Sequence, residues 1–483
     1  MKKRKYLAAV ILGTGALVSC SLTPDYLRPD AGLPKEAPVS WEQGVKAQKE
    51  ESDLNAGWWH GFGSDTLLRL QKAGLAQNHD FAARGWQLAQ AVAQARVARA
   101  PLFPWLGAEV HGSRLGEHDN RTHRFSMTDT VSGSFQASYE VDIWGKLRSQ
   151  ADSASFIAEA TLNDWRAAGL SLESDIALAY FYLLGQKERL AVQSRILDAA
   201  RQMLDYMEKR HRAGAASPLD IARQKSDVAA MEARVEELER VAQAATNNLN
   251  NLLGNAVITD ELSDAIRKEK LTDLLAPAVP AGLPSDLLIR RPDILSAEAM
   301  LKSANADIGA ARAAFLPSIF LTAQGGTQSS SLHNLFHSSS LFYALASSLV
   351  APIFEGGRLE AQLDITLARR EEMVARYQQA ALSAFLEVDT AIAANAFLMR
   401  EEKKRREASE QAQEAYRIVS VRYAAGAEEF LAVLDAQRTM LNAEDAVVTV
   451  ALARLNASAG LFKALGGGWA ESLPPENISS GKL

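Results

Sequence analysis

Residues 132–150 read SGSFQASYEVDIWGKLRSQ, and the hydrophobic period changes in the middle of this stretch. In its first half every second side chain is apolar, at Phe135, Ala137, Tyr139 and Val141. This period is typical of a strand with one apolar face. After Trp144 and Gly145 the chain is rich in Ala, Leu, Glu, Gln and Arg, which predicts a long helix. The stretch therefore predicts a strand that ends at an aromatic residue and leads directly into a helix.

The same change of period occurs twice in the chain. Prolines are absent from 105–217 and again from 353–473, as uninterrupted helices require. Residues of the first window recur 212 or 213 positions later, in strand, turn and helix segments alike. The clearest pairs are Gly145-Lys146-Leu147 with Gly357-Arg358-Leu359, and Arg210 and Gly214 with Arg422 and Gly426. An offset that holds over segments of different structure predicts a tandem duplication.

Each copy is predicted to contain a helix, two strands joined by a loop, a long helix, a turn and a returning helix. In the first copy the helices span 64–100, 145–212 and 218–253, and the strands span 104–113 and 131–143. In the second copy the helices span 294–314, 357–424 and 430–465, and the strands span 317–326 and 340–354. The returning helices carry apolar residues at heptad spacing, which predicts coiled-coil contacts with neighbouring helices.

The segments outside the repeats complete the domain organisation. We predict a lipoprotein signal peptide at 1–19, an extended proline-rich segment at 20–63, the first repeat at 64–254, a linker at 255–291, the second repeat at 292–466 and a polar tail at 467–483. The first segment has a basic start and an apolar stretch, which is typical of a secretory signal. The string Leu17-Val18-Ser19-Cys20 also resembles a bacterial lipobox, in which Cys20 becomes the lipid-modified N-terminus. The alternative is a plain secretory signal with an incidental cysteine.

The bulk composition excludes several classes of function. The 483 residues carry a formal net charge of −6, and the basic residues are spread along helical stretches, so nucleic-acid binding is not expected. Because Cys20 is the only cysteine, an internal disulfide and a multi-thiolate metal site are impossible. The histidines near the strand loops are not at ligand spacings: His111, His118, His123, His333 and His337. No motif of an enzyme is present, so we expect no catalytic residue, no metal and no cofactor other than the lipid on Cys20.

Four strands of about ten residues have the right length to cross a bilayer. No run of eighteen apolar residues follows the signal, so any membrane span must use strands. A closed barrel needs at least eight strands, and open edges are not tolerated in lipid, so several copies of the chain would have to assemble. Trp105, Trp144 and Phe354 fit the aromatic belt at the membrane interface, and Gly145 and Gly357 mark the strand-to-helix junctions. The alternative is a soluble antiparallel sheet packed on a helical bundle.

Several strings occur in an order that resembles the TolC/OprM family of outer-membrane efflux proteins, in its lipoprotein branch. They are YEVDIWGKLR, GLPSDLLIRRPDILSAEAML, ANADIGAARAAFLPSIFLTA, APIFEGGRLEAQ, RYAAG and FLAVLDAQRTMLNAE. The resemblance covers essentially the whole mature chain. It implies an α+β membrane protein: a homotrimer whose twelve strands form an outer-membrane barrel that continues into a long periplasmic helical tunnel. It also implies a periplasmic adaptor and an inner-membrane pump of the RND type, which together export drugs, solvents or metal ions.

The resemblance further implies that the tunnel closes at its periplasmic tip, in the stretch RYAAGAEEFLAVLDAQR at 422–438. Leu431, Asp435 and Arg438 are four and three positions apart and share one helix face. Symmetry would turn them into an apolar constriction, a charged ring and its partner. Tyr423 matches a family tyrosine that latches the tip, and Asp220 and Arg223 form a similar string in the first repeat. The alternative is that Asp435 and Arg438 are an ordinary exposed pair.

Three other functions remain open on the sequence alone. One is a type I protein-secretion duct within the same family. Another is a structural coiled-coil lipoprotein without a pore, which does not account for duplicated strands. The third is a periplasmic enzyme, which lacks a catalytic constellation. The lipobox and the string GLPSDLLIRRPD favour efflux of small compounds.

Overall fold

The structure is a computed structural model that describes residues 22–34, 58–119, 124–214, 217–277 and 290–467. The predicted signal peptide and Cys20 lie outside these residues. The chain divides into two compact units. The first contains residues 1–29, 87–162 and 296–378, and the second contains residues 30–86, 163–295 and 379–483.

The first unit holds one antiparallel sheet with the strand order β1-β2-β3-β4. The strands are β1 (Trp105–Asp119), β2 (Arg124–Val141), β3 (Ser318–Ser329) and β4 (Leu341–Val350). Among the described residues, β1 and β4 each pair on one side only, so the sheet of a single chain is open at both edges.

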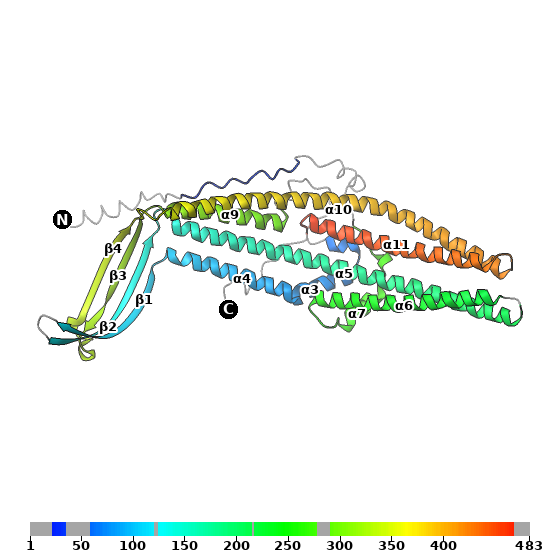
Figure 1. The fold of residues 1–483 in the computed structure, drawn as a ribbon, viewed down its shortest axis with the longest axis horizontal. Coiled ribbons are helices and arrows are strands. Elements are labelled where there is room, and N and C mark those ends of the chain that lie inside the picture. The colour runs from blue at the N-terminus through cyan, green and yellow to red at the C-terminus, as the bar shows by residue number, and fades with distance from the viewer. Residues whose placement is uncertain (1–21, 35–57, 120–123, 215–216, 278–289, 468–483) are drawn as a thin grey trace. The chain divides into compact units, whose positions relative to one another are not determined.

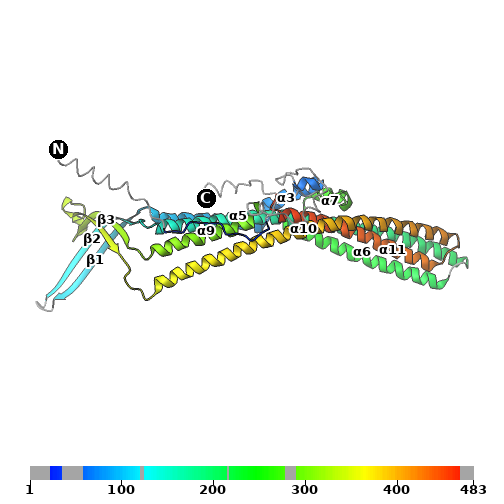
Figure 2. The same cartoon turned by 90° about the horizontal axis from the view of Figure 1, so that it is seen from above.

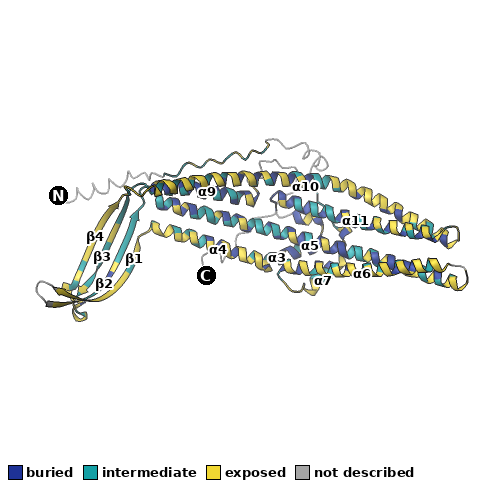
Figure 3. Ribbon diagram, viewed as in Figure 1, coloured by how far each residue is buried: buried dark blue, intermediate teal, exposed yellow. Residues whose placement is uncertain are grey.

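The register of the four strands collects their apolar side chains on one face. That face carries Leu106, Ala108 and Val110 of β1, Phe135, Ala137, Tyr139 and Val141 of β2, Ile319, Leu321 and Ala323 of β3, and Leu345 and Leu349 of β4. The opposite face carries Gln136, Ser138 and Glu140. Every residue of β4 except Phe342 is exposed (Figure 3). A continuous exposed apolar face of this kind needs a partner or a lipid environment.

The strands of the first copy are longer than predicted. Most of the segment 115–130, which we expected to be a polar loop, extends β1 to Asp119 and lets β2 begin at Arg124. Across these extensions the Arg114 guanidinium contacts the Asp129 carboxylate, with Nε 2.6 Å from Oδ1. Backbone pairing needs no apolar side chain, so a polar strand escapes detection by hydrophobic period.

The duplication is evident in the helices. The long helices α5 (Lys146–Arg212) and α10 (Arg358–Ala424) both have 67 residues, and both begin and end 212 positions apart. The returning helices are α6 (Pro218–Leu253) and α11 (Phe430–Ala464). Figures 1 and 2 show α5 beside α6 and α10 beside α11 as two hairpins. At 1.5 Å per residue each long helix measures about 100 Å.

Glycines with positive φ mark equivalent ends in both repeats. Gly214 and Gly426 lie in the turns of the two hairpins, at φ 76° and 75°. Gly254 and Gly466 follow the returning helices, at φ 74° and 67°. Since side chains other than glycine rarely adopt these angles, the repeated glycines explain why the helix ends were predictable.

The helix predicted at 64–100 is interrupted. It consists of α3 (Asp65–Gln77), α4 (His79–Arg99) and the 3₁₀ turn η3 (Ala100–Leu102). Asn78 separates the first two, because its side chain accepts the backbone N–H of Phe81 and so begins a new helix. The counterpart in the second repeat is α9 (Pro292–Ala313).

Short elements fill the connections between the repeats and strands. The predicted linker contains α7 (Asp260–Lys268) and η4 (Leu271–Asp273). The β3–β4 connection contains η5 (Leu332–Asn334) and η6 (Ser338–Ser340). The turn η2 (Trp58–Phe62) precedes α3 and supplies aromatic residues to the core of the second unit.

That core is built around rings from both repeats. Trp58 stacks on Phe462 with ring centroids 5.4 Å apart, and Phe62 lies 5.2 Å from Phe181. The four rings are buried and come from η2, α5 and α11. The turn before the first repeat therefore joins helices of the two repeats.

Three helices, α5, α10 and α11, contain an 18-residue window that is apolar enough, by length and composition, to cross a membrane. The prediction rested on the absence of an unbroken run of eighteen apolar residues. These windows reach the composition criterion because it allows polar residues and up to two charged residues among leucine, isoleucine, phenylalanine and alanine. Within the subunit 56% of the α5 window and 44% of the α11 window are buried. Part of this apolar surface is thus already covered by protein.

Candidate functional site

Three residues predicted to share one helix face line a groove near the ends of the hairpins. The groove has a volume of about 1010 Å³ and lies in the second unit, between α6 and α11. Leu431, Asp435 and Arg438 line it from α11. The residues opposite them on α6 are Asp227, Met231 and Arg234, which were not predicted.

The charged members of this face form the predicted pair. Arg438 Nη2 lies 2.9 Å from Asp435 Oδ1, and the two side chains are 75% and 67% exposed. An ion pair this exposed contributes little to stability. Leu431 is also exposed, although leucine is usually buried. The exposed positions of Leu431, Asp435 and Arg438 therefore do not stabilise the single subunit.

Tyr423 is a packing residue within the subunit. Its ring lies 5.6 Å from that of Phe430, in a cluster with Met207 and Val433. Burial raises the pKa of the Tyr423 hydroxyl, which also lies near the charges of Arg210 and Asp220. The side chain therefore connects α10 with α11 and with the first hairpin.

Asp220 and Arg223 occupy the first turns of α6, and Arg223 Nη1 lies 4.0 Å from Asp220 Oδ1. Neither lines the groove, which takes its α6 residues from later turns. Near the other turn, Arg422 Nε lies 3.1 Å from Glu428 Oε2. The two similar Asp-Arg pairs therefore differ in position. Asp435 and Arg438 line the groove, whereas Asp220 and Arg223 lie at the start of α6.

Further along the helices, polar contacts that the sequence did not reveal attach α11 to its neighbours. Glu444 accepts Arg195 Nη2 of α5 at 2.8 Å and Gln413 Nε2 of α10 at 2.7 Å. Glu402 of α10 accepts Arg454 Nη1 of α11 at 2.7 Å. Only chain folding brings these partners together, because they are 31 or more positions apart in the sequence.

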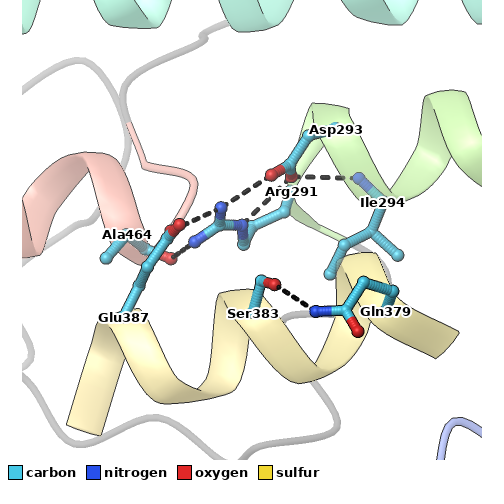
Figure 4. A network of polar contacts seen from close by, with 7 residues as sticks. All are labelled: Arg291, Asp293, Ile294, Gln379, Ser383, Glu387 and Ala464. Atoms are coloured by element: carbon cyan, nitrogen blue, oxygen red, sulfur yellow. Dashed lines mark hydrogen bonds and ion pairs between the residues drawn. The ribbon is translucent and has the colours of Figure 1, made fainter. Parts of the chain in front are cut away.

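Arg291 is 7% exposed and has polar contacts to three different residues (Figure 4). Its Nη1 donates to the carbonyl of Ala464 at 2.7 Å, its Nη2 lies 2.8 Å from Glu387 Oε2, and its Nε donates to Asp293 at 3.0 Å. One side chain thus joins the start of α9, the middle of α10 and the last turn of α11.

The first repeat has an equivalent contact. Asn78 Nδ2 donates to the carbonyl of Leu252 at 2.9 Å, at the end of α6. Asn78 precedes Arg291 by 213 positions, and Leu252 precedes Ala464 by 212. Both repeats therefore hold the end of the returning helix with a side chain located just before the helix that leads to the sheet.

The predicted strand-to-helix junctions have the expected backbone. Gly145 and Gly357 have φ 75° and 82°, and each directly precedes a long helix. In the first junction the backbone N–H groups of Leu147 and Arg148 both donate to the Asp142 carboxylate at 3.0 Å. The Asp142 carboxylate pairs with N–H groups that have no partner within α5, and its negative charge interacts favourably with the helix dipole at this N-terminus.

The three predicted interface aromatics have different surroundings. Trp144 Nε1 donates to the carbonyl of Pro317 at 2.8 Å, so its ring is fixed at the end of the sheet. Phe354 is 88% exposed after β4. Trp105 pairs with Ser138 at the start of β1 and therefore lies on the polar face of the sheet. Its ring covers Gly107, where the missing side chain leaves room.

Among the described residues, no group of three or more His, Cys, Asp or Glu side chains is placed to hold a metal ion. His333 and His337 lie near each other, with ring centroids 6.1 Å apart. His123 lies outside the described residues.

One buried carboxyl of the second unit predicts a pH dependence. Burial raises the pKa of Glu173 to about 7, and Trp59 Nε1 donates to its Oε2 at 3.3 Å. The protonated form is favoured in the folded state, so its stabilisation is complete below about pH 4.5 and is lost as pH rises to about 7.

Glu173→Gln is therefore expected to raise the free energy of unfolding at pH 8 by up to about 3 kcal/mol. At pH 4.5 the substitution should change it little. Circular dichroism melting at the two pH values measures this difference. Asp175→Asn, at an exposed position two residues on, is the control. An equal effect of Glu173→Gln at both pH values would contradict the assignment.

Comparison with known proteins places this architecture in a family. Residues 70–255 and 283–467 both match the family described as outer membrane efflux protein. The chain is 37% identical over 476 residues to the pyoverdine export outer membrane protein OpmQ of Pseudomonas aeruginosa, and the match covers 97% of each protein. It is 33% identical over 482 residues to the probable efflux pump outer membrane protein TtgC of Pseudomonas putida, covering 98% of each.

A solved structure leads to the same conclusion. The open state of the MtrE outer membrane channel of Neisseria gonorrhoeae aligns with a TM-score of 0.82 at 31% identity. The alignment covers 93% of this chain and 98% of that one. The fold, the duplication and the relatives agree, and the chain belongs to the outer membrane efflux protein family.

Proposed function

We propose that this protein is the outer-membrane exit duct of a tripartite efflux system. The observation that carries the proposal is a four-stranded sheet with two open edges and one apolar face, which passes twice into a helix of 67 residues. Lipid does not tolerate open edges, and a barrel needs at least eight strands. Three copies provide twelve strands, and their helices continue as a tunnel in the periplasm. Such a channel is not an enzyme.

The duct receives its cargo from other proteins. An inner-membrane pump of the RND type selects the compound, and a periplasmic adaptor connects the pump to the hairpin ends of this chain. The names of OpmQ and TtgC refer to pyoverdine export and to an efflux pump. For this chain we propose small toxic compounds as cargo, among them drugs, solvents and metal ions. Crosslinkers placed at 213–223 and 425–438 should capture the adaptor in cells, and failure at both turns would contradict this assembly.

A genetic experiment tests the transport function. Cells that lack the gene should accumulate a fluorescent efflux substrate, and the intact gene should restore its exclusion. A secretion duct would instead restore the export of a protein without changing accumulation of the dye. A structural lipoprotein would restore neither.

The gate of the duct is proposed to lie in the groove at the hairpin ends. Leu431 would form an apolar ring, Asp435 a charged ring, and Arg438 the partner of Asp435. Tyr423, Asp220 and Arg223 would keep the two hairpins in the closed arrangement. The exposure of the Leu431, Asp435 and Arg438 side chains supports this proposal, because a ring around an axis must face the lumen.

Replacing Asp435 and Arg438 together by alanine is expected to raise the single-channel conductance about twofold, because two rings of the constriction lose their side chains. Planar-bilayer recording measures the change. Lys404 and Glu407 form another exposed i, i+3 pair on α10, and their double alanine variant is the control. Unchanged conductance in the Asp435 and Arg438 variant would remove both residues from the gate.

We also propose that Cys20 carries a lipid that anchors the chain in the outer membrane. Several acyl chains on one residue bind firmly, since each buried methylene contributes about 0.8 kcal/mol. Radioactive palmitate should label the wild-type protein and fail to label Cys20→Ser. Equal labelling of both proteins would place the lipid elsewhere.

A further inference from the structure

The first unit has an apolar recess at the foot of β1. It has a volume of about 800 Å³. Val97 of α4, Pro101 of η3 and Phe103 line it before the sheet begins, and Trp105 of β1, Tyr139 of β2 and Phe320 of β3 line it from the sheet. It exists because β1 begins short of its partner: Trp105 pairs with Ser138, while β2 continues to Val141. The recess therefore lies beside the start of this edge strand.

The opposite edge of the same sheet ends in exposed apolar side chains. After β4 the chain continues through Pro352, which cannot donate to a ladder, to Ile353 and Phe354. Ile353 is 97% exposed and Phe354 is 88% exposed, in a short link that precedes α10. A phenylalanine can bury about 150–250 Å² of surface, so leaving one in water is costly. These two side chains need a partner outside their own subunit.

The topology brings the recess and the exposed pair together. When copies close a barrel, β4 of one copy pairs antiparallel with β1 of the next, because these are the two open edges. The start of β1 and the end of β4 lie at the same end of the sheet, since both strands connect there to helices. Phe354 follows Val350 by four residues, which span about 13 Å at full extension. Adjacent strands are about 4.8 Å apart, so the next recess is within reach.

We propose that Ile353 and Phe354 of one copy insert into the recess at the foot of β1 of the neighbouring copy. This proposal rests on the multi-copy barrel proposed above and adds a specific contact to it. The contact seals the corner where the sheet changes into helices, at a point where Tyr139 has no partner residue on β1. It also gives Phe354 a protein partner at the membrane interface in place of a lipid chain.

Photocrosslinking tests the contact in the intact, membrane-inserted protein. A benzophenone side chain at position 354 should give a covalent dimer in denaturing gels, and mass spectrometry should locate the adduct among the recess residues of the second copy, within 97–106, at 138–140 or at Phe320. Phe336 is the matched control, because it is 86% exposed and lies in the β3–β4 connection at the other end of the strands. The same probe at position 336 should give no adduct within 97–106.

Other adducts at position 354 would overturn the proposal: a lipid, another part of the second copy, or a residue of the same chain. Native mass spectrometry of the same sample separates the two proposals, since a trimer with the wrong adduct contradicts only the contact, whereas a monomer contradicts the barrel. In addition, the fraction of trimer that survives heating in detergent should fall for Phe354→Ala. At the same temperature Phe336→Ala should keep the wild-type fraction of trimer. Equal dissociation of the two variants would also contradict the contact.

Discussion

Replacing Arg291 by alanine is expected to lower the free energy of unfolding of the helical part by about 2–4 kcal/mol, because hydrogen bonds to charged groups contribute about 1.5–3 kcal/mol each. The partner acids Asp293 and Glu387 are about half exposed and can be solvated once the arginine is gone. The carbonyl of Ala464 loses its donor, and the end of α11 loses its attachment to α9. Thermal melting followed by helical circular dichroism measures the loss.

Two variants control this experiment. Arg291→Lys keeps the charge but cannot reproduce the planar fork, so it should melt between the wild type and Arg291→Ala. Arg417→Ala removes an arginine that pairs with Glu414 on the exposed surface of α10, so it should melt close to the wild type. If Arg291→Ala and Arg417→Ala melted alike, Arg291 would have no role in joining the three helices.

The second large effect is expected at Gly254. A β-carbon there would lie 2.2 Å from the backbone oxygen of Gln77, and the residue has φ 74°. A left-handed conformation costs about 1–2 kcal/mol for other residues, and overpacking costs about 1–3 kcal/mol, so Gly254→Ala should lose about 2–5 kcal/mol. Chemical denaturation of the detergent-solubilised protein measures the change.

The substitution Gly426→Ala separates the conformational cost from the cost of overpacking. Its φ is 75°, but a β-carbon there would meet no atom within 4 Å. Gly426→Ala should therefore lose only the conformational part, about 1–2 kcal/mol. Equal losses for the two variants would contradict the close contact between Gly254, at the end of α6, and the backbone of Gln77.

Much of the architecture follows from local sequence signals. Gly214 and Gly426 have positive φ in the hairpin turns, and they place the ends of α5 and α10 within a residue of the predicted bounds. Gly145 and Gly357 mark the junctions in the same way. These positions were predictable because a tight reversal or a change from strand to helix requires a particular backbone conformation, which only glycine adopts at low cost.

Other features depend on contacts between distant segments and left no local signal. The sequence predicts a loop where the polar halves of β1 and β2 lie, since the hydrophobic period does not detect a polar strand. The residue type of Trp105 fits the aromatic belt at the membrane interface, but the face of the sheet on which it lies is determined by its register with Ser138. The carboxylates that meet Arg195 and Arg291 come from other helices, and no spacing in the sequence predicts them.

At the candidate gate the sequence predicted the members of the face but not their surroundings. Leu431, Asp435 and Arg438 lie on one face because of their helical spacing, as expected. The α6 side of the groove, with Asp227 and Met231, depends on how the two returning helices approach each other. That approach is determined by the packing of several helices, which a one-dimensional pattern does not contain.

The central claim is that copies of this chain enclose a continuous duct through the outer membrane. Planar-bilayer recording of the purified trimer tests it most directly, with the Asp435→Ala and Arg438→Ala double variant measured beside the wild type. A continuous duct should give discrete conductance steps, larger in the variant than in the wild type. Trimers that insert into the bilayer and conduct in neither form would contradict it.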